Sequence, residues 1–440
     1  MSKFDVIVVG AGPGGATCAS YLAMNGLNVL LVDKDKFPRD KTCGDAVGGK
    51  TLQHIHAIGA HQAIIDSQHY KYTAITMSSA NGNSMTIPLV GNEFAHNTAG
   101  YVVQRDILDN ELFKAAKKHV EANGGDVLEG VKVTGVIWND SQGGEDPGEN
   151  SGDQRVASGI TYLDNKKVEH QAHAKMVIGA GGYNCPIARE LVIDTYGDKY
   201  QERDHWSAAF REYYTDVEGC KPENGAMEIH FVEGILPGYF WIFPAGDGLI
   251  NVGTGMLLSE MDKTNAKVKK LQHEIIREHP IFKQRFKNSK LVEGSSKGWM
   301  LPLGSPRGNR KYEPRRSAGN RVLLIGDAAS LIDPFTGEGI GNAMVSAKFA
   351  SETISRIFDG NDPVKEGEEF MKNIWEHLGP ELTNSHKLQK MLKHKRLMNW
   401  VIGKAGRKPK IQAMLTDMLA SKESQTKIHS KWFLLRMFLF

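Results

Sequence analysis

The chain has 440 residues, 40% of them hydrophobic and 24% charged, with a net charge of +3, which is the balance of a globular protein with a large core. No apolar run reaches the ~20 residues that a membrane-spanning helix needs, and we expect no signal peptide. Four cysteines are too few for a disulfide scaffold and lack metal-site spacing, so we expect no metal and a reducing, cytoplasmic compartment.

The first elements of the chain predict a βαβ unit. The apolar run Val6–Val9 predicts a buried strand, Ala16–Met24 predicts a helix, and Gly26–Val32 predicts the second strand. Such a unit opens many nucleotide-binding domains, so the residues between the first strand and the helix decide its function.

Glycines in the turn of this unit have the G-x-G-x-x-G spacing of a dinucleotide site. Gly10 permits the sharp turn, Gly12 the approach of a pyrophosphate, and Gly15 the close packing of helix on strand, with Gly14 between them. The unpaired N–H groups of the helix N-terminus then face the phosphates. Asp33, at the end of the second strand, is placed to accept hydrogen bonds from a ribose.

The remaining elements alternate between helices and strands. In chain order we predict a helix at Leu52–Ile65, strands within Tyr70–Leu89, a helix at Asp106–Asn123, paired strands within Val127–Trp138, an exposed loop at Asn139–Gln154, strands at Gly159–Leu163, Met176–Ala180 and within Trp206–Gly255, a helix at Asn265–Glu278, a strand at Arg321–Ile325 and a helix at Gly339–Phe358. We expect the strands near residues 1, 180 and 325 to share one sheet.

A second cofactor motif lies at Arg321–Met344, where a strand delivers a Gly-Asp pair and the glycine-rich run Thr336–Gly341 opens a helix. This segment resembles the FAD-binding signature of the p-hydroxybenzoate-hydroxylase-like flavoproteins. The resemblance implies that Asp327 contacts the ribityl chain, and that Gly339 and Ile340 lie beside the flavin pyrimidine ring.

Two shorter segments resemble the same family. Val103–Asp109 is similar to its V-x-R-x-x-x-D stretch, which implies that Arg105 reaches the FAD phosphates and ribityl; a helix-surface charge is the alternative. Val131–Val133 resembles the strand whose backbone touches the adenine, which implicates Val133. The segment Ala180–Gly182 departs from the usual Ala-Asp-Gly, which weakens any inference that NAD(P)H docks as in the aromatic hydroxylases.

The run P-G-Y-F-W-I-F-P at Pro237–Pro244 resembles the P-x-Y-x-W-x-F-P motif of the geranylgeranyl reductase family. Alternate residues of an extended segment project to one side, so the three aromatic residues of the motif form a wall that suits an apolar polyprenyl chain. An ordinary strand that buries aromatic residues is the alternative. The expected substrate-binding residues are Pro237, Tyr239, Trp241, Phe243 and Pro244.

Upstream, Lys41–Asp45 resembles the Cys-Gly loop that this family places beside the flavin, which implies that Cys43, Gly44 and Asp45 adjoin the cofactor. A thiol there can act in proton delivery or in redox poise, which makes Cys43 the candidate catalytic residue. The alternative is that Cys43 is a small residue fitting a tight loop.

The C-terminal segment 386–440 is strongly basic, with 13 Lys/Arg against 2 Asp/Glu, which gives it a net charge of +11 and leaves −8 for the rest of the chain. It ends in K-W-F-L-L-R-M-F-L-F, where basic, aromatic and aliphatic residues are interleaved. That pattern predicts peripheral association with a membrane surface, with a helical subdomain as the alternative. We expect no nucleic-acid partner.

Together these features predict an α/β (overall α+β) protein with a Rossmann-like FAD-binding domain of the p-hydroxybenzoate-hydroxylase type. The expected domains are a discontinuous FAD-binding domain (1–70, 100–190 and 300–360), a substrate domain with an antiparallel sheet (71–99 and 191–299) and a helical, basic C-terminal region (361–440).

The function that the resemblance implies is FAD-dependent saturation of isolated C=C bonds in geranylgeranyl chains of membrane lipids or their precursors, by hydride transfer. The alternative is a flavin monooxygenase or halogenase of the same fold, although halogenases resemble W-x-W-x-I-P where this chain has Y-F-W-I-F-P. A non-catalytic flavoprotein would not explain the full set of motifs. The sequence leaves NAD(P)H, ferredoxin and a quinol open as electron donor, and leaves the head group of the substrate open.

Overall fold

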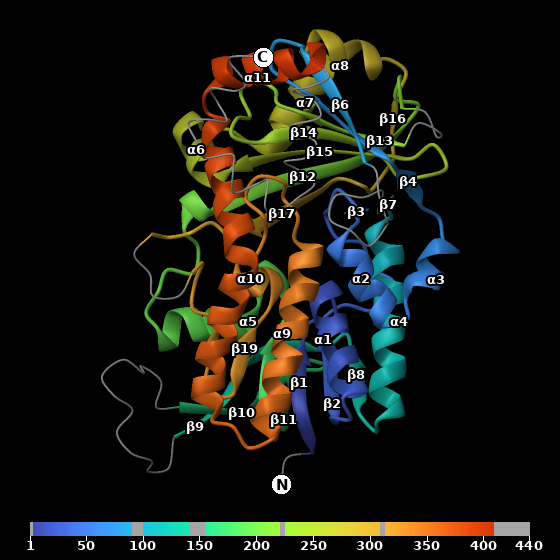
Figure 1. The fold of residues 1–440 in the computed structure, drawn as a ribbon. Helices are drawn as coiled ribbons and strands as arrows, with labels where there is room; N and C mark the ends of the chain where they lie inside the picture. The colour runs from blue at the N-terminus through green and yellow to red at the C-terminus, as the bar shows by residue number, and fades with distance from the viewer. Residues whose placement is uncertain (1–2, 90–99, 141–154, 221–224, 309–312, 409–440) are drawn as a thin grey trace.

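The computed structural model describes residues 3–89, 100–140, 155–220, 225–308 and 313–408. The described strands form three sheets, two large and one small (Figure 1). The sheet that holds the N-terminal strand lies at one end of the molecule, and the second large sheet lies at the other end (Figure 1).

The first sheet has a parallel centre in the order β18-β19-β11-β1-β2-β8. Its central strands read as continuous apolar runs because they are buried almost throughout, as is typical of parallel strands. Two further strands extend β11 as an antiparallel ribbon. The strands are β1 (Phe4–Val9), β2 (Val29–Asp33), β8 (Asp126–Glu129), β9 (Lys132–Asp140), β10 (Arg155–Leu163), β11 (Glu169–Gly179), β18 (Ala318–Gly319) and β19 (Val322–Leu324). The strands near residues 1, 180 and 325 therefore share one sheet, as the sequence predicts.

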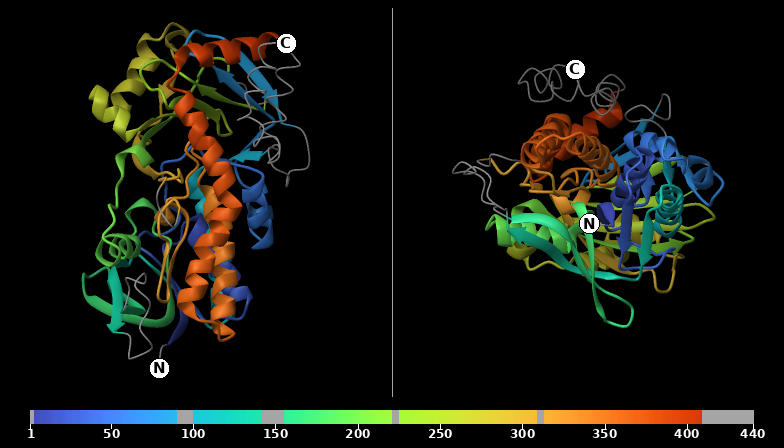
Figure 2. Two further views of the ribbon diagram at one scale, coloured as in Figure 1. Left: turned by 60° about the vertical axis from the view of Figure 1, so that its left-hand side comes forward. Right: turned by 90° about the horizontal axis from the view of Figure 1, so that it is seen from below.

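Four long helices pack with this sheet into one core. Helix α1 lies between α4 and α9, and α10 packs along α9 and continues toward the second sheet (Figure 2). Their bounds are α1 (Pro13–Met24), α4 (Arg105–Ala122), α9 (Ile340–Phe358) and α10 (Pro363–Met391). This arrangement brings the start of α9 next to the glycine turn that opens α1, although more than 300 residues separate them.

The second sheet has the order β16-β12-β15-β14-β13-β5-β6, with β17 also paired to β12. Helices α7 and α8 cover one face, and α11 packs along β6. The elements are β5 (Ala74–Ser78), β6 (Ser84–Pro88), β12 (Trp206–Thr215), β13 (Ala226–His230), β14 (Tyr239–Pro244), β15 (Ile250–Leu257), β16 (Lys290–Leu291), β17 (Lys297–Pro302), α6 (Leu258–Thr264), α7 (Val268–Glu278), α8 (Pro280–Arg285) and α11 (Lys395–Arg407). The sheet is antiparallel except for the parallel pair β5–β13.

A small sheet, β3-β7-β4, follows the Cys43 loop. It consists of β3 (Ala46–Val47), β4 (Tyr70–Tyr72) and β7 (Gly100–Val102), and the short helices nearby in sequence are α2 (Lys50–Ala57) and α3 (His61–Ile65). The remaining short helices are α5 (Pro186–Arg189), a π-helical stretch at Glu190–Thr195 and 3-10 turns at Gly182–Asn184, Arg203–His205 and Gly326–Ala329.

Three sequence predictions are wrong in detail. The helix predicted at 52–65 is two helices, because Gly59 adopts a φ of +77° after the first ends. The helix predicted at 265–278 begins at Val268, since Asn265 is left-handed and caps α6. The strands within 127–138 do not pair with each other: β8 pairs with β2 and β9 with β10.

Two other predictions concern segments only partly described. The predicted exposed loop begins inside β9, and its residues 141–154 lie outside the described ranges. Of the basic C-terminal segment, the structure describes residues 386–408, which include α11, and the predicted membrane-surface tail lies beyond them. In the described part of the chain, no helix combines the length and the apolar character that crossing a membrane requires.

Candidate FAD and substrate site

The glycine turn at the start of α1 is built around two close backbone approaches. Gly10 has a φ of +103°, and a Cβ there would lie 2.5 Å from the Ala180 carbonyl oxygen. A Cβ on Gly15 would lie 1.7 Å from the Gly10 carbonyl oxygen. At Gly12 the nearest atom to such a Cβ is Nη2 of Arg39, at 3.5 Å. Gly12 is therefore the position that stays open toward a cationic side chain, which is the environment a pyrophosphate needs.

Asp33 is almost buried, and its carboxylate binds the backbone of this turn. Its Oδ2 accepts a hydrogen bond from the Ala11 N–H (2.6 Å), and its Oδ1 accepts one from the Asp35 N–H (2.9 Å). Burial raises the pKa of Asp33, while these two N–H groups oppose that rise. The Val131 N–H donates to the Asp33 carbonyl (3.0 Å), so the segment containing Val133 starts beside Asp33. Contacts of Asp33 with ribose and of Val133 with adenine stay predictions.

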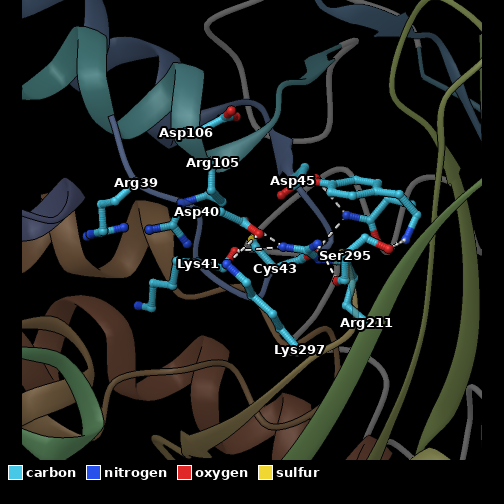
Figure 3. Close-up of polar contacts among 12 residues, drawn as sticks. Arg39, Asp40, Lys41, Cys43, Asp45, Arg105, Asp106, Arg211, Ser295 and Lys297 are labelled. Carbon is cyan, nitrogen blue, oxygen red and sulfur yellow. Dashed lines mark hydrogen bonds and ion pairs between the residues drawn. The ribbon is translucent and has the colours of Figure 1, made fainter. Parts of the chain in front are cut away.

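Three cations gather near the glycine turn, two from the loop after β2 and one from the start of α4 (Figure 3). Arg105, at the start of α4, forms a bidentate ion pair with Asp109 (2.7 Å for both contacts). Arg39 reaches the same carboxylate from the loop after β2 (2.6 Å), and Lys41 lies 3.5 Å from Asp327. Arg39 also lies 3.7 Å from Asp35, so each of the three cations has a carboxylate partner.

Asp327 follows β19 at the carboxyl end of the parallel sheet, as the sequence predicts. A Cβ on Gly339, the N-cap of α9, would lie 3.6 Å from Asp327 Oδ1, so the two halves of the second motif adjoin. Ile340 is the first residue of α9. Gly14 of α1 packs against the first turn of α9, where a Cβ on Gly14 would lie 3.1 Å from the Ala343 Cβ. Both predicted FAD motifs therefore meet at one place.

The aromatic motif forms β14, and its side chains alternate between two faces. Phe240 and the next-but-one Ile242 join the core under α7 and α8. On the opposite face, Tyr239 lies 6.0 Å from Trp241 and Trp241 lies 6.4 Å from Phe243, measured between ring centroids. We call Tyr239, Trp241 and Phe243 the aromatic wall. Of the flanking residues, Pro244 ends β14, and Pro237 is separated from the start of β14 by Gly238.

The aromatic wall contacts both cofactor-motif loops. The Tyr239 hydroxyl donates a hydrogen bond to the Thr336 carbonyl, in the loop before α9. A Cβ on Gly44 would lie 2.9 Å from Cε2 of Phe243, so Gly44 lets the Cys43 loop close on the wall. The structure thus brings the predicted substrate motif to the predicted cofactor motifs.

Cys43 lies between the cation cluster and the wall. Burial raises the pKa of its thiol, and the neighbouring Arg105 guanidinium opposes that rise. Since the ordinary thiol pKa is already above neutrality, the Cys43 side chain keeps its proton at neutral pH. Its carbonyl accepts a hydrogen bond from the side-chain amide of Asn251 (2.8 Å). Cys18 and Cys185 are buried in the core around the first sheet.

Several polar residues of this region were not predicted from the sequence. Arg39 and the Arg211–Asp40 pair are buried or half-buried ion-pair partners that connect the Cys43 loop to β12 and α4. The local signal is the density of charge in R-D-K-T-C-G-D at residues 39–45, which lies in the loop that follows a buried strand. Asn251 lies on β15, and its contacts depend on the pairing of β14 with β15.

The residues present fit FAD. A helix N-terminus, an open Gly12 and the adjacent Arg39 guanidinium suit its pyrophosphate. Within the described ranges, Thr42 Oγ1 and Asp45 Oδ1 are buried polar atoms without a hydrogen-bond partner, both in the loop predicted to adjoin the flavin. Buried polar groups are costly when unpaired, so this loop has hydrogen-bonding capacity to offer a bound group.

Comparison with known families agrees with this geometry. The FAD binding domain family matches residues 3–216, and the geranylgeranyl reductase catalytic domain family matches residues 206–296, which contain the aromatic wall. FAD is therefore the cofactor of this chain.

Curated relatives and solved structures cover most of the chain. The digeranylgeranylglycerophospholipid reductase of Methanocella arvoryzae is 29% identical over 89% of this chain and 88% of its own length. The menaquinone reductase of Mycobacterium tuberculosis is 28% identical over 80% of this chain and 76% of its own length.

Among solved structures, a geranylgeranyl bacteriochlorophyll reductase-like protein from Thermoplasma acidophilum has a TM-score of 0.75 at 23% identity, covering 100% of this chain and 99% of that one. The flavin-dependent brominase Bmp2 has a TM-score of 0.69 at 20% identity, covering 95% and 93%. These likenesses confirm the predicted fold class.

Proposed function

The chain belongs to the FAD-dependent oxidoreductases with a geranylgeranyl reductase catalytic domain, and from that membership we propose that it saturates isolated C=C bonds in geranylgeranyl or related polyprenyl chains. Reduced FAD, when bound, supplies the hydride for such a saturation. The observation that carries the proposal is the contact of the aromatic wall with the Cys43–Gly44 loop and with Thr336. An unactivated alkene offers no polar group, so shape and burial must hold it.

The roles of the chain's own residues follow from their positions. Trp241 and Phe243, both nearly buried, would exclude water from an alkene held against the Cys43–Gly44 loop. Cys43 holds a proton at Sγ in this loop, and an alkene that receives a hydride at one carbon needs a proton at the other. We assign Cys43 the role of proton donor to the second carbon. The site residues inferred from the two families (Gly10, Gly12, Gly14, Gly15, Asp33, Arg105, Val133, Asp327, Gly339 and Ile340) would hold the cofactor.

The carrier of the prenyl chain is a membrane lipid or its precursor in this proposal. The phospholipid reductase among the relatives supports a lipid, and the menaquinone reductases support a prenylated quinone as the competing carrier. The two are distinguished by offering a geranylgeranylated phospholipid and a prenylated quinone to the same enzyme. NAD(P)H, ferredoxin and a quinol stand as the possible natural donors, and each can be offered in turn.

The test is saturation of the prenyl chain without oxygen. FAD-loaded protein reduced chemically under anaerobic conditions should add two hydrogens per double bond, as read by mass spectrometry. In Trp241→Ala, loss of a buried aromatic contact worth about 3–5 kcal/mol should reduce turnover steeply while FAD stays bound. The matched control is Trp138→Ala, an indole on β9. Unchanged turnover in Trp241→Ala, or a product that forms only with oxygen, would refute the proposal and favour the monooxygenase or halogenase alternative.

We also propose that the basic C-terminal segment attaches the enzyme to a membrane surface, where a polyprenyl lipid lies. The described part of this segment contains α11, whose Trp400 ring carries the Lys404 ammonium at 4.9 Å from its centroid. Each Lys or Arg near an anionic surface contributes about 1 kcal/mol, and salt screens that attraction. Deleting residues 431–440 should reduce flotation with anionic liposomes without loss of FAD. Equal flotation of both proteins would contradict the membrane role of that tail.

A further inference from the structure

A chain of hydrogen bonds links the aromatic wall to a buried acid. The Trp241 Nε1–H donates to Asn251 Oδ1 (2.8 Å), and Asn251 Nδ2 donates to Asp45 Oδ2 (2.6 Å) as well as to the Cys43 carbonyl. Because an indole only donates and a carbonyl only accepts, these contacts fix the orientation of the Asn251 amide. One amide therefore holds the wall, the Cys43 loop and Asp45 together.

Asp45 is fully buried and unevenly paired. Its Oδ2 also accepts a hydrogen bond from the Tyr213 hydroxyl, whereas Oδ1 has no partner among the residues described. Burial raises the pKa of Asp45 to about 7, although the Arg211 guanidinium opposes the rise. The carboxyl thus changes its charge close to neutral pH, where an ordinary aspartate is always ionised.

The charges around Asp45 come from several elements (Figure 3). The charged and titratable groups that face it are Arg211 and Tyr213 on β12, Arg105 with its partner Asp109 on α4, and Cys43 in the same loop. Arg211 is buried, stacks on the Tyr213 ring at 4.2 Å, and donates to Asp40 (2.6 Å). Asp40 in turn pairs with Lys297 (2.9 Å). Lys297, Asp40 and Arg211 therefore influence Asp45 through their electric field. Because arginine keeps its proton, they do not conduct a proton from the surface to Asp45.

We propose that Asp45 is a positioning residue for the aromatic wall, whose charge state sets how firmly Asn251 holds the Trp241 indole and the Cys43 loop. Hydrogen bonds to an ionised acceptor are about twice as strong as those to a neutral one. The ionised carboxylate therefore fixes Asn251, and through it Trp241, more firmly than the neutral acid. This role rests on the proposed function, because it bears on catalysis only if Trp241 contacts the prenyl chain.

The test follows the indole N–H of Trp241 by NMR in the FAD-loaded enzyme with ¹⁵N-labelled tryptophan. The resonance is identified by its absence from Trp241→Phe. We expect it to shift with pH around one midpoint near 7 in the wild type and to stay constant in Asp45→Asn. Asparagine has the same shape as aspartate and tolerates the left-handed backbone that position 45 adopts (φ of +64°). A resonance that does not titrate in the wild type, or that titrates equally in Asp45→Asn, would overturn the proposal.

A second variant keeps the proposal testable if Asp45→Asn fails to fold. Asp40 is partly exposed and compensates Arg211, so Asp40→Asn leaves the Arg211 charge free to stabilise ionised Asp45. The midpoint of the Trp241 shift should therefore move to lower pH, and an unchanged midpoint would overturn the role of Asp45. Enzyme that shows both titrations and saturates no prenyl chain would refute the proposed function and still support the positioning role.

Discussion

At the scale of single residues, the aromatic wall depends on Gly253, which leaves room for the Trp241 indole. Gly253 on β15 is paired with Trp241 on β14, and a Cβ on Gly253 would lie 2.0 Å from Cζ2 of the indole. The Trp241 indole therefore occupies the space that a side chain at position 253 would fill. Its position results from this glycine and from the hydrogen bond to Asn251 on the same strand.

Gly253→Ala should displace the indole and lower prenyl saturation while FAD stays bound. Forcing a methyl group into a packed site costs about 1–3 kcal/mol, and the indole has to leave its rotamer. The matched control is Gly255→Ala on the same strand, where the nearest atoms to the new Cβ are 3.9 and 4.0 Å away. The measurement is the FAD content and the rate of prenyl saturation of both variants. Equal rates in Gly253→Ala and Gly255→Ala would show that the position of Trp241 does not limit the reaction.

At the scale of elements, local patterns predicted what depends on local sequence. The βαβ unit at the N-terminus and the long helix after residue 339 follow from glycine spacing and apolar periodicity, and they stand within a few residues of their predicted bounds. The helix predicted across Gly59 was wrong, because apolar spacing continues through a residue whose backbone breaks the helix.

Pairings between distant strands could not be predicted in this way. The strands β8 and β9 are separated by two residues, yet they pair with different partners, β2 and β10. The buried network of Asp45 has the same origin: Tyr213, Asn251 and Asp45 become neighbours only when β12 and β15 pair and the Cys43 loop folds against them. Motif residues that bind a common cofactor could be found one by one, whereas contacts among the residues that support them required the structure.

At the scale of the whole molecule, buried histidines make stability depend on pH. His54, His205 and His386 are nearly buried or half-buried, and burial lowers the pKa of each to about 4. His54 pairs with the Tyr21 hydroxyl and His205 with the Ser305 hydroxyl (2.7 Å each). An unfolded histidine has a pKa near 6.5, so between about pH 6.5 and 4 the unfolded chain binds protons that the folded protein does not.

The free energy of unfolding should therefore fall as the pH drops from about 6.5 toward 4, by about 1.4 kcal/mol per pH unit for each proton taken up. Asp45 acts in the opposite direction, since its raised pKa makes the folded protein hold a proton there that the unfolded chain has lost. Burial also raises the pKa of Asp33 and Asp333, which act with Asp45, and lowers the pKa of His279, which acts with the three histidines. The contribution of the buried rings is therefore read from a variant that lacks two of them. With flavin release as the signal, the unfolding temperature of His205→Gln/His386→Gln should fall less on acidification than that of the wild type. His170→Gln, an exposed histidine, should follow the wild type, and parallel curves for all three proteins would contradict a role for the buried rings.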